Sequence, residues 1–269
     1  MKRRLLILLL LLGAWHSMDA MHSCYATLQK DTLRIGNDVL ERCFLWNGGA
    51  LKTISVVDKR IHSVLRAMGK QPDFAIAKGN AEQGSMSSRW IESNGVHPGY
   101  LCVEVFYLQG SLSIKRIFRV YGNAIACDTY LKGVMKKVGN DVVASNVDRK
   151  NIESVEDMAT ELKTPTLDRL QLSGNHWQTK AVEFFDYTDW NDNLVLERNF
   201  IPYRKNGCRG NLLFAKDQLS GNGFFFLKES PVSSTQLHYG GADFITDFND
   251  FMVVGTGVAA SDISKDDWT

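Results

Sequence analysis

Hydrophobic and polar residues alternate along much of this chain with a period of two, which is typical of half-buried β-strands. The alternation is clearest over residues 112–120. One face of this segment carries Leu112, Ile114, Arg116, Phe118 and Val120. A turn at Gly122 and Asn123 follows, and the alternation resumes over residues 125–131. Because Gly and Asn tolerate the positive φ of tight hairpin turns, we predict a hairpin here, with residues 101–108 as a third antiparallel strand.

Comparable strand patterns recur before and after this hairpin. The other predicted strands are 39–46, 51–57, 181–187, 195–201, 212–216, 224–228 and 251–254. Glycine-rich turns join two pairs of them, at Asn47-Gly48-Gly49 and at Gly221-Asn222-Gly223. Only residues 151–162 have apolar positions at helical spacing. Many short strands joined by turns predict an all-β fold, a large two-sheet antiparallel sandwich with few short helices.

The first fifteen residues have the layout of a secretory signal peptide. Three positive charges precede an unbroken apolar run that is too short to span a bilayer. We therefore expect an exported protein, in the periplasm or at the cell surface, with a signal peptide over residues 1–26. Cleavage is expected after Ala26, with the segment Met18-Asp19-Ala20 as a poorer alternative. A lipid anchor on Cys24 is a further alternative, which would change only where the protein is tethered.

The composition of the rest of the chain is typical of a globular protein. The hydrophobic content of 44% is sufficient for one large or two small domains. The 31 basic residues nearly balance the 30 acidic ones, and no basic patch stands out, so nucleic acid is not expected as a partner. Four of the cysteines lie beyond the signal segment, too few for a disulfide scaffold in so long a chain. Because Cys43, Cys102 and Cys127 lie within apolar strand patterns, we expect them to be buried free thiols.

Two motifs that could carry chemistry lack the context they need. Residues 255–260 match a dinucleotide-binding glycine fingerprint, but too few residues follow for the required βαβ unit. Asp189, Asn191 and Asn193 imitate the first ligands of a calcium loop, but Leu194 stands where the obligatory glycine should be. The histidines show no metal-ligand spacing. We therefore expect neither a bound metal nor a cofactor.

Aromatic and short polar side chains are interleaved between residues 177 and 193. Aromatic ring faces stack on the apolar C–H patches of a pyranose, and Asp or Asn side chains hydrogen-bond its hydroxyls. The candidate substrate-binding residues are Trp177, Asp189, Trp190, Asn191 and Asp192. We expect Trp190, which has polar neighbours on both sides, to lie on a loop and to stack on a sugar. The alternative is that Trp177 and Trp190 are core or hairpin aromatics.

Several blocks of the chain resemble exported bacterial glycoside hydrolases of the α-galactosidase type (clan D, melibiase-like), and they occur in the same order. The blocks are DTLRIGN from Asp31, LWNGGAL from Leu45, VEFFDYTDWNDN from Val182, GFFFLKESP from Gly223, VGTGV from Val254 and DWT from Asp267. The resemblance extends from about Asp31 to the last residue. A set of ordered blocks is more specific than any one of them alone.

The resemblance implies a domain organisation. In that family a β-supersandwich of the galactose-mutarotase type comes first, and a linker leads to a (β/α)8 barrel that carries both catalytic aspartates. Residues 27–258 would then form the sandwich, and residues 259–269 would begin the linker. No catalytic residue of the family maps onto this chain, because barrel active sites are built on loops at the barrel strands' C-terminal ends. The implied partners are α-galactoside oligosaccharides and the chain's own barrel, with a homo-oligomer as a further option.

The C-terminal residues alone allow two interpretations, a fragment of a longer protein or a frayed tail, and the resemblance favours the fragment. Residues 264–267 resemble a helix-capping signature, with the Ser264 hydroxyl ahead of two aspartates. We therefore expect a non-catalytic N-terminal domain of a secreted α-galactoside hydrolase. The alternative is a free-standing exported carbohydrate-binding or scaffold sandwich. A sugar mutarotase is a third option, which would need a His and a carboxylate converging in a cleft.

Overall fold

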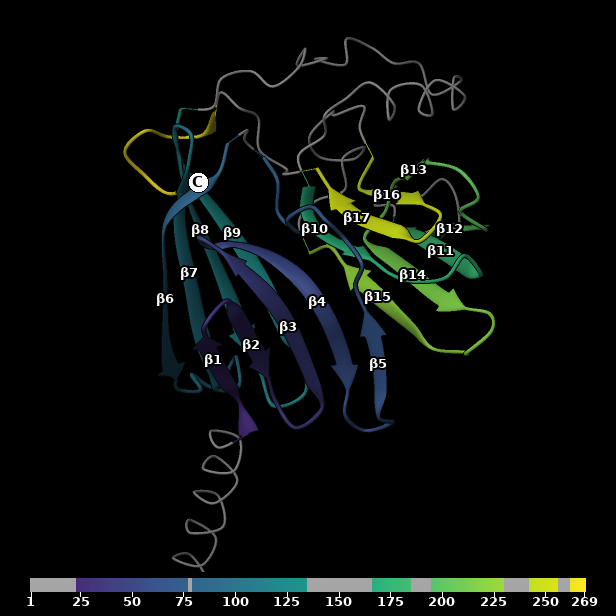
Figure 1. Ribbon diagram of the computed structural model, residues 1–269, viewed down its shortest axis with the longest axis horizontal. Helices are drawn as coiled ribbons and strands as arrows, with labels where there is room; N and C mark the ends of the chain where they lie inside the picture. The colour runs from purple at the N-terminus through teal and green to yellow at the C-terminus, as the bar shows by residue number, and fades with distance from the viewer. Residues whose placement is uncertain (1–22, 77–78, 135–165, 185–194, 230–241, 256–261) are drawn as a thin grey trace, which may run out of the picture. The chain divides into compact units, whose positions relative to one another are not determined.

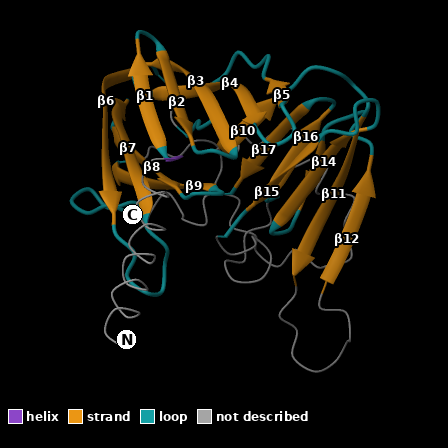
Figure 2. Ribbon diagram, turned by 90° about the horizontal axis from the view of Figure 1, so that it is seen from below, coloured by secondary structure: helices purple, strands orange, loops and turns teal. Residues whose placement is uncertain are grey.

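The computed structural model describes residues 23–76, 79–134, 166–184, 195–229, 242–255 and 262–269. Seventeen β-strands lie in these ranges, arranged in four antiparallel sheets (Figures 1 and 2). The predicted all-β antiparallel class is confirmed. The helix predicted over residues 151–162 lies outside the described residues.

The chain divides into two compact units. The first comprises residues 1–66, 80–109 and 113–131, and the second comprises residues 67–79, 110–112 and 132–269. Each unit contains two of the four sheets. The strands are therefore distributed over two smaller sandwiches rather than over two continuous sheets.

The first unit has a five-stranded and a four-stranded sheet. The five-stranded sheet has the order β1 (Tyr25–Gln29), β2 (Thr32–Gly36), β3 (Leu40–Asn47), β4 (Ala50–Asp58) and β5 (Ser63–Arg66). The four-stranded sheet has the order β6 (Ala81–Ile91), β7 (Tyr100–Gln109), β8 (Leu112–Val120) and β9 (Ile125–Gly133). The predicted hairpins β3–β4 and β8–β9 are both present, and the predicted inner face of β8 is buried, including Arg116.

The two sheets of the first unit enclose a hydrophobic core. The rings of Phe44 on β3 and Phe118 on β8 lie 5.5 Å apart and are both buried. The β3–β4 turn packs onto the other sheet at Gly49, whose φ is 103°. A Cβ on Gly49 would lie 2.6 Å from the Cβ of Tyr107, so only glycine fits there.

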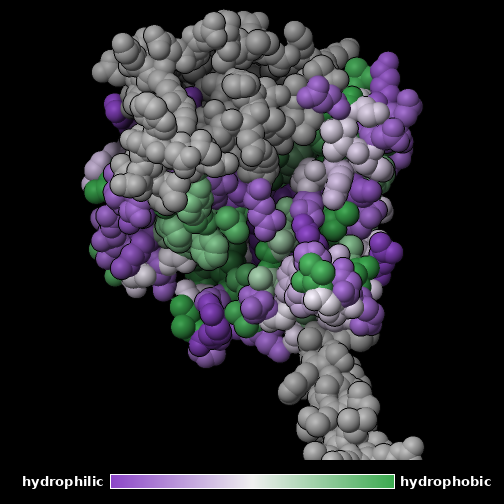
Figure 3. Space-filling model, turned by 180° about the vertical axis from the view of Figure 1, so that it is seen from behind, coloured by the Kyte–Doolittle hydropathy of each residue, from purple (hydrophilic) through white to green (hydrophobic). Residues whose placement is uncertain are grey.

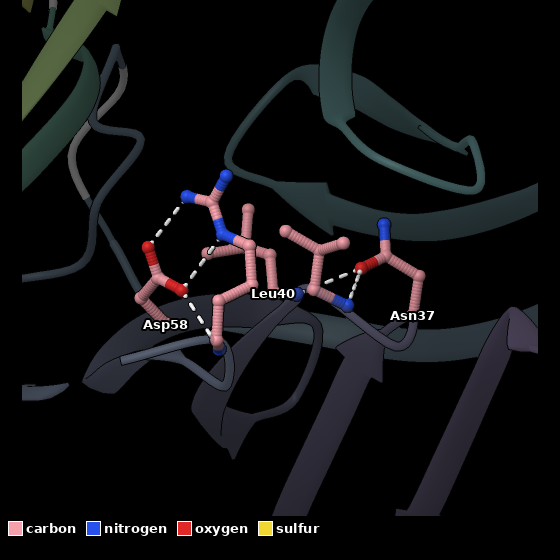
Figure 4. A network of polar contacts seen from close by, with 5 residues as sticks. Asn37, Leu40 and Asp58 are labelled. Carbon is pink, nitrogen blue, oxygen red and sulfur yellow. Dashed lines mark hydrogen bonds and ion pairs between the residues drawn. The ribbon is translucent and has the colours of Figure 1, made fainter. Parts of the chain in front are cut away.

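Asn37 joins two turns of the first unit. Its Oδ1 atom accepts hydrogen bonds from the backbone nitrogens of Val39 (2.8 Å) and Leu40 (2.7 Å). Its Nδ2 atom donates to the backbone oxygen of Tyr121 at 2.6 Å. Figure 4 shows the Asn37 side chain directed at the backbone near Leu40. Since the side chain is fully buried, these bonds satisfy polar atoms that would otherwise destabilise the fold.

The second unit has two four-stranded sheets (Figure 2). One has the order β10 (Thr166–Gln171), β17 (Asp250–Val254), β16 (Phe244–Asp247) and β13 (Asn206–Cys208). The other has the order β12 (Val195–Phe200), β11 (Trp177–Phe184), β14 (Leu212–Asp217) and β15 (Gly223–Leu227). The predicted hairpin around Gly221-Asn222-Gly223 is confirmed as β14–β15.

The thiols agree with most of the expectations from the sequence. All five cysteines are free; Cys43 and Cys102 are buried and Cys127 is half-buried. Cys208, which the sequence pattern does not place in a strand, lies in β13 and is buried. Burial raises the pKa of the Cys208 thiol to about 12, so it is protonated at neutral pH and is a poor nucleophile.

The capping signature near the C-terminus is present in the structure. The Ser264 hydroxyl accepts hydrogen bonds from the backbone nitrogens of Asp266 at 3.1 Å and Asp267 at 3.0 Å. No helix follows Ser264 within residues 262–269, where residues 265–267 form a bend, so the hydroxyl closes a local turn rather than capping a helix.

Candidate functional site

Four of the five predicted sugar-binding residues lie outside the described residues, namely Asp189, Trp190, Asn191 and Asp192. The fifth, Trp177, is predicted from the sequence to bind sugar, but it is a core residue of the second unit. Its side chain is only 3% exposed at the start of β11. Its ring packs edge-on against Phe224 (5.8 Å) and Phe251 (5.4 Å), so Phe251 joins it to the opposite sheet. A ring enclosed by other rings has no free face for a sugar.

The outward side of the sheet β12-β11-β14-β15 carries large apolar side chains. We call this surface the outer face; its apolar members are Phe184, Leu212, Phe214, Phe225 and Leu227. The exposed fractions are 48% for Phe184, 41% for Phe214, 61% for Phe225 and 55% for Leu227. Single exposed apolar residues are common on proteins, but a contiguous group of them marks an interaction surface.

Strand register makes the outer face contiguous. Phe214 pairs with Phe225, and Leu212 pairs with Leu227 across β14 and β15. Paired residues of adjacent strands have Cβ atoms about 4.5–5.5 Å apart, so each pair forms one apolar row. The rings of Phe214 and Phe225 lie 5.9 Å apart with an interplanar angle of 37°. Figure 3 shows hydrophobic side chains gathered at the surface among hydrophilic ones.

Polar side chains flank these rows on β11. The Lys180 ammonium forms an ion pair with Glu197 of β12 at 2.8 Å, and Lys180 itself is paired with Phe214 in the sheet register. The Gln218 amide donates to the Gln178 carbonyl oxygen at 2.8 Å. These groups already bind one another, which leaves the apolar rows as the dominant chemistry of the outer face.

The sequence contains a signal for the outer face. Residues 224–227 are a continuous apolar run, whereas a strand with one solvated face shows alternation. Phe224 and Phe226 point inward, where their rings contact each other edge-on at 5.4 Å. Phe225 and Leu227 point to the opposite side. A strand that is apolar on both sides needs a second covering layer or a ligand.

A buried ion pair lies at one end of the same sheet. Lys228 is 4% exposed and Asp243 is fully buried, and their Nζ and Oδ1 atoms are 2.5 Å apart. The second carboxylate oxygen of Asp243 accepts a hydrogen bond from the backbone nitrogen of Gly210 at 3.0 Å. Since Lys228 follows β15 and Asp243 precedes β16, the pair joins the two sheets. Its enclosure indicates a structural role rather than a site open to substrate.

Metal-ligand clusters and membrane-spanning helices are both absent from the described part of the chain. It contains no group of three or more His, Cys, Asp or Glu side chains arranged to hold a metal ion. Among the same residues, no helix has the length and hydrophobicity that crossing a membrane requires. The outer face is the candidate functional site that the geometry supports best, because its exposed apolar side chains lie in adjacent rows.

Comparisons with known proteins identify no relative. No protein-family model matches the chain, and no curated protein or solved structure is significantly similar to it.

Proposed function

We propose that this chain is the non-catalytic N-terminal β domain of an exported glycoside hydrolase that acts on α-galactosides. The outer face would then pack against the catalytic barrel of the same protein. The observation that carries the proposal is the contiguous apolar surface formed by Phe214, Phe225 and Leu227 on one sheet. Such a surface is costly to leave in water and is typical of a buried interface.

Two further observations support this function. The ordered blocks from Asp31 to Thr269 resemble α-galactosidase-type hydrolases, whose first domain is a β-sandwich. The antiparallel all-β fold agrees with that kind of domain. The mixture of Phe and Leu side chains on the outer face also suits a protein partner, because leucine offers a sugar neither a ring face nor a hydrogen bond.

The second candidate function is carbohydrate binding by a free-standing sandwich. The pair of exposed rings, Phe214 and Phe225, favours it, since neighbouring aromatic rings can stack on a sugar chain. In this case the half-exposed ion pair of Lys180 and Glu197 would exchange its mutual contact for hydrogen bonds to the sugar. A single substitution in the outer face separates the two candidates.

The proposal predicts that Phe225→Ser destabilises the protein encoded by the whole gene but not the chain that ends at Thr269. In the whole protein the ring would be buried at an interface, and burying a Phe side chain contributes about 1.5–3 kcal/mol. In the shorter chain Phe225 is 61% exposed, and exposed substitutions usually change stability by less than about 0.5 kcal/mol. Thermal unfolding of both proteins measures the difference.

Leu219→Ser is the matched control, because Leu219 is 75% exposed in the β14–β15 turn and lies off the outer face. It should leave both melting temperatures unchanged. If Phe225→Ser left the melting temperatures of both proteins unchanged, the proposal that the outer face packs against the barrel would be contradicted. Loss of retention of the shorter chain on a galactose-bearing polysaccharide would instead support the second candidate.

A further inference from the structure

The first strand of the structure begins before the cleavage point expected from the sequence. Strand β1 starts at Tyr25, whereas the sequence predicts cleavage after Ala26. The strand pairs with β2 in a continuous antiparallel register that includes Tyr25 with Gly36 and Ala26 with Ile35. Cleavage after Ala26 would therefore divide an edge strand of the first unit.

The Tyr25 side chain is bonded to two other elements. Its hydroxyl donates a hydrogen bond to Glu41 Oε2 at 2.5 Å and accepts one from Lys59 Nζ at 2.9 Å. The Lys59 ammonium also lies over the Tyr25 ring, 4.8 Å from the ring centroid, in a cation–π contact. Burial and the hydrogen bond to Glu41 raise the pKa of the phenol, so it remains a donor.

The surrounding backbone is adapted to the Tyr25 ring. A Cβ on Gly36 would lie 2.6 Å from the Tyr25 hydroxyl oxygen and 2.8 Å from Cζ, so glycine leaves the space that the ring fills. Lys59 also donates to the backbone oxygen of Asn37 at 2.5 Å. Without Tyr25, Lys59 and Glu41 would each lose a charge-assisted hydrogen bond, and Gly36 would lie beside an empty space.

We infer that the export signal is removed upstream of Tyr25, so that the mature chain keeps the whole of β1. The inference rests on the export that forms part of the proposed function. The step is hydrolysis of one peptide bond by a host signal peptidase: the C–N bond breaks, and water adds its hydroxyl to the leader's new carboxyl group and a proton to the new amine of the mature chain. Ala20 and Ser23 are the small residues that could precede that bond.

The direct test is to express the full chain in an exporting bacterial host and to determine the N-terminus of the exported protein by sequencing and intact mass. The expected mature chain begins at Met21 or Cys24. A mature chain that begins at Thr27 would overturn the inference while leaving export intact. A chain that retains Met1 would contradict export, and with it both the inference and that part of the proposed function.

Variants at Ala26 and Tyr25 test the inference in ways that do not depend on one mass measurement of the wild-type protein. Ala26→Leu places a large residue where a cut after position 26 needs a small one, and we expect it to leave the processed N-terminus unchanged. Accumulation of the precursor would overturn the inference.

In the exported protein, Tyr25→Ala should lower the melting temperature more than Tyr25→Phe, which keeps the ring over Gly36. Equal melting temperatures for wild type and Tyr25→Ala would show that Tyr25 is dispensable, against the inference.

Discussion

Replacing Lys228 with methionine is expected to lower the free energy of unfolding of the second unit by about 3–5 kcal/mol, as for other buried ion pairs that lose one partner. The reason is that the Asp243 carboxylate would remain fully buried after losing the ammonium that neutralises its charge. The ammonium is also the group that joins the end of β15 to the sheet containing β16. Urea unfolding followed by intrinsic fluorescence measures the loss.

Two further variants show whether the buried charge is the cause. The double variant Lys228→Met with Asp243→Leu should recover much of the loss, because it leaves no uncompensated charge. Lys180→Met removes one partner of an exposed ion pair with Glu197, and it should cost less than about 1 kcal/mol. If Lys228→Met costs no more than Lys180→Met, the buried pair does not stabilise the second unit in the way described.

The Trp177→Ala variant is expected to destabilise the second unit by about 3–5 kcal/mol, the usual range for a buried aromatic residue. Trp177 is enclosed by Phe224 and Phe251, and its indole nitrogen donates to the Ser173 backbone oxygen at 3.3 Å. Truncation would leave a cavity between the two sheets. Trp177→Phe, which retains most of the ring volume, should cost less, and thermal unfolding of the two variants gives the comparison.

This prediction also decides between the two roles that the sequence leaves open for Trp177. A core residue affects stability and leaves the sugar affinity of the folded protein unchanged. If Trp177→Ala instead kept the melting temperature of the wild type and weakened binding of an α-galactoside, Trp177 would be a binding residue after all. That result would contradict its placement in the core.

Local patterns predict the central hairpins correctly. In β3–β4 and β8–β9, alternation defines the strands and short turns define the connection, and both signals lie within a few residues of each other. The turn at Gly48 and Gly49 has positive φ at both residues, as a type I′ hairpin turn requires. These features depend on neighbouring residues alone, so the sequence contains them in full.

Other strands depend on contacts that the sequence pattern does not reveal. Strand β6 is mostly polar and exposed, and a register shift interrupts it between Glu82 and Ser85, so it shows no clear alternation. The β1–β2 hairpin turns at Lys30, whose φ of 52° is unusual for a residue other than glycine. The division into two units is also not predicted by the pattern of alternation. Alternation indicates that a strand has a buried face, but it does not show which sheet covers that face.

The candidate site was only partly predictable for a similar reason. Alternating aromatic and polar residues around Trp177 suggest a sugar site, but composition alone does not show which rings are enclosed. The run over residues 224–227 shows that β15 is apolar on both sides, and the structure assigns Phe225 and Leu227 to the exposed side. Tertiary packing decides whether an aromatic or apolar side chain is enclosed, like Trp177, or exposed, like Phe225 and Leu227.

The most direct test of the proposed function is the rate at which a chromogenic α-galactoside is hydrolysed, measured in parallel for two proteins. One is the chain that ends at Thr269, and the other is the protein encoded by the whole gene. The proposal predicts turnover by the whole protein and none by the shorter chain, because the catalytic aspartates of the hydrolases it resembles belong to the barrel. Turnover by the shorter chain alone, or none by the whole protein, would contradict it.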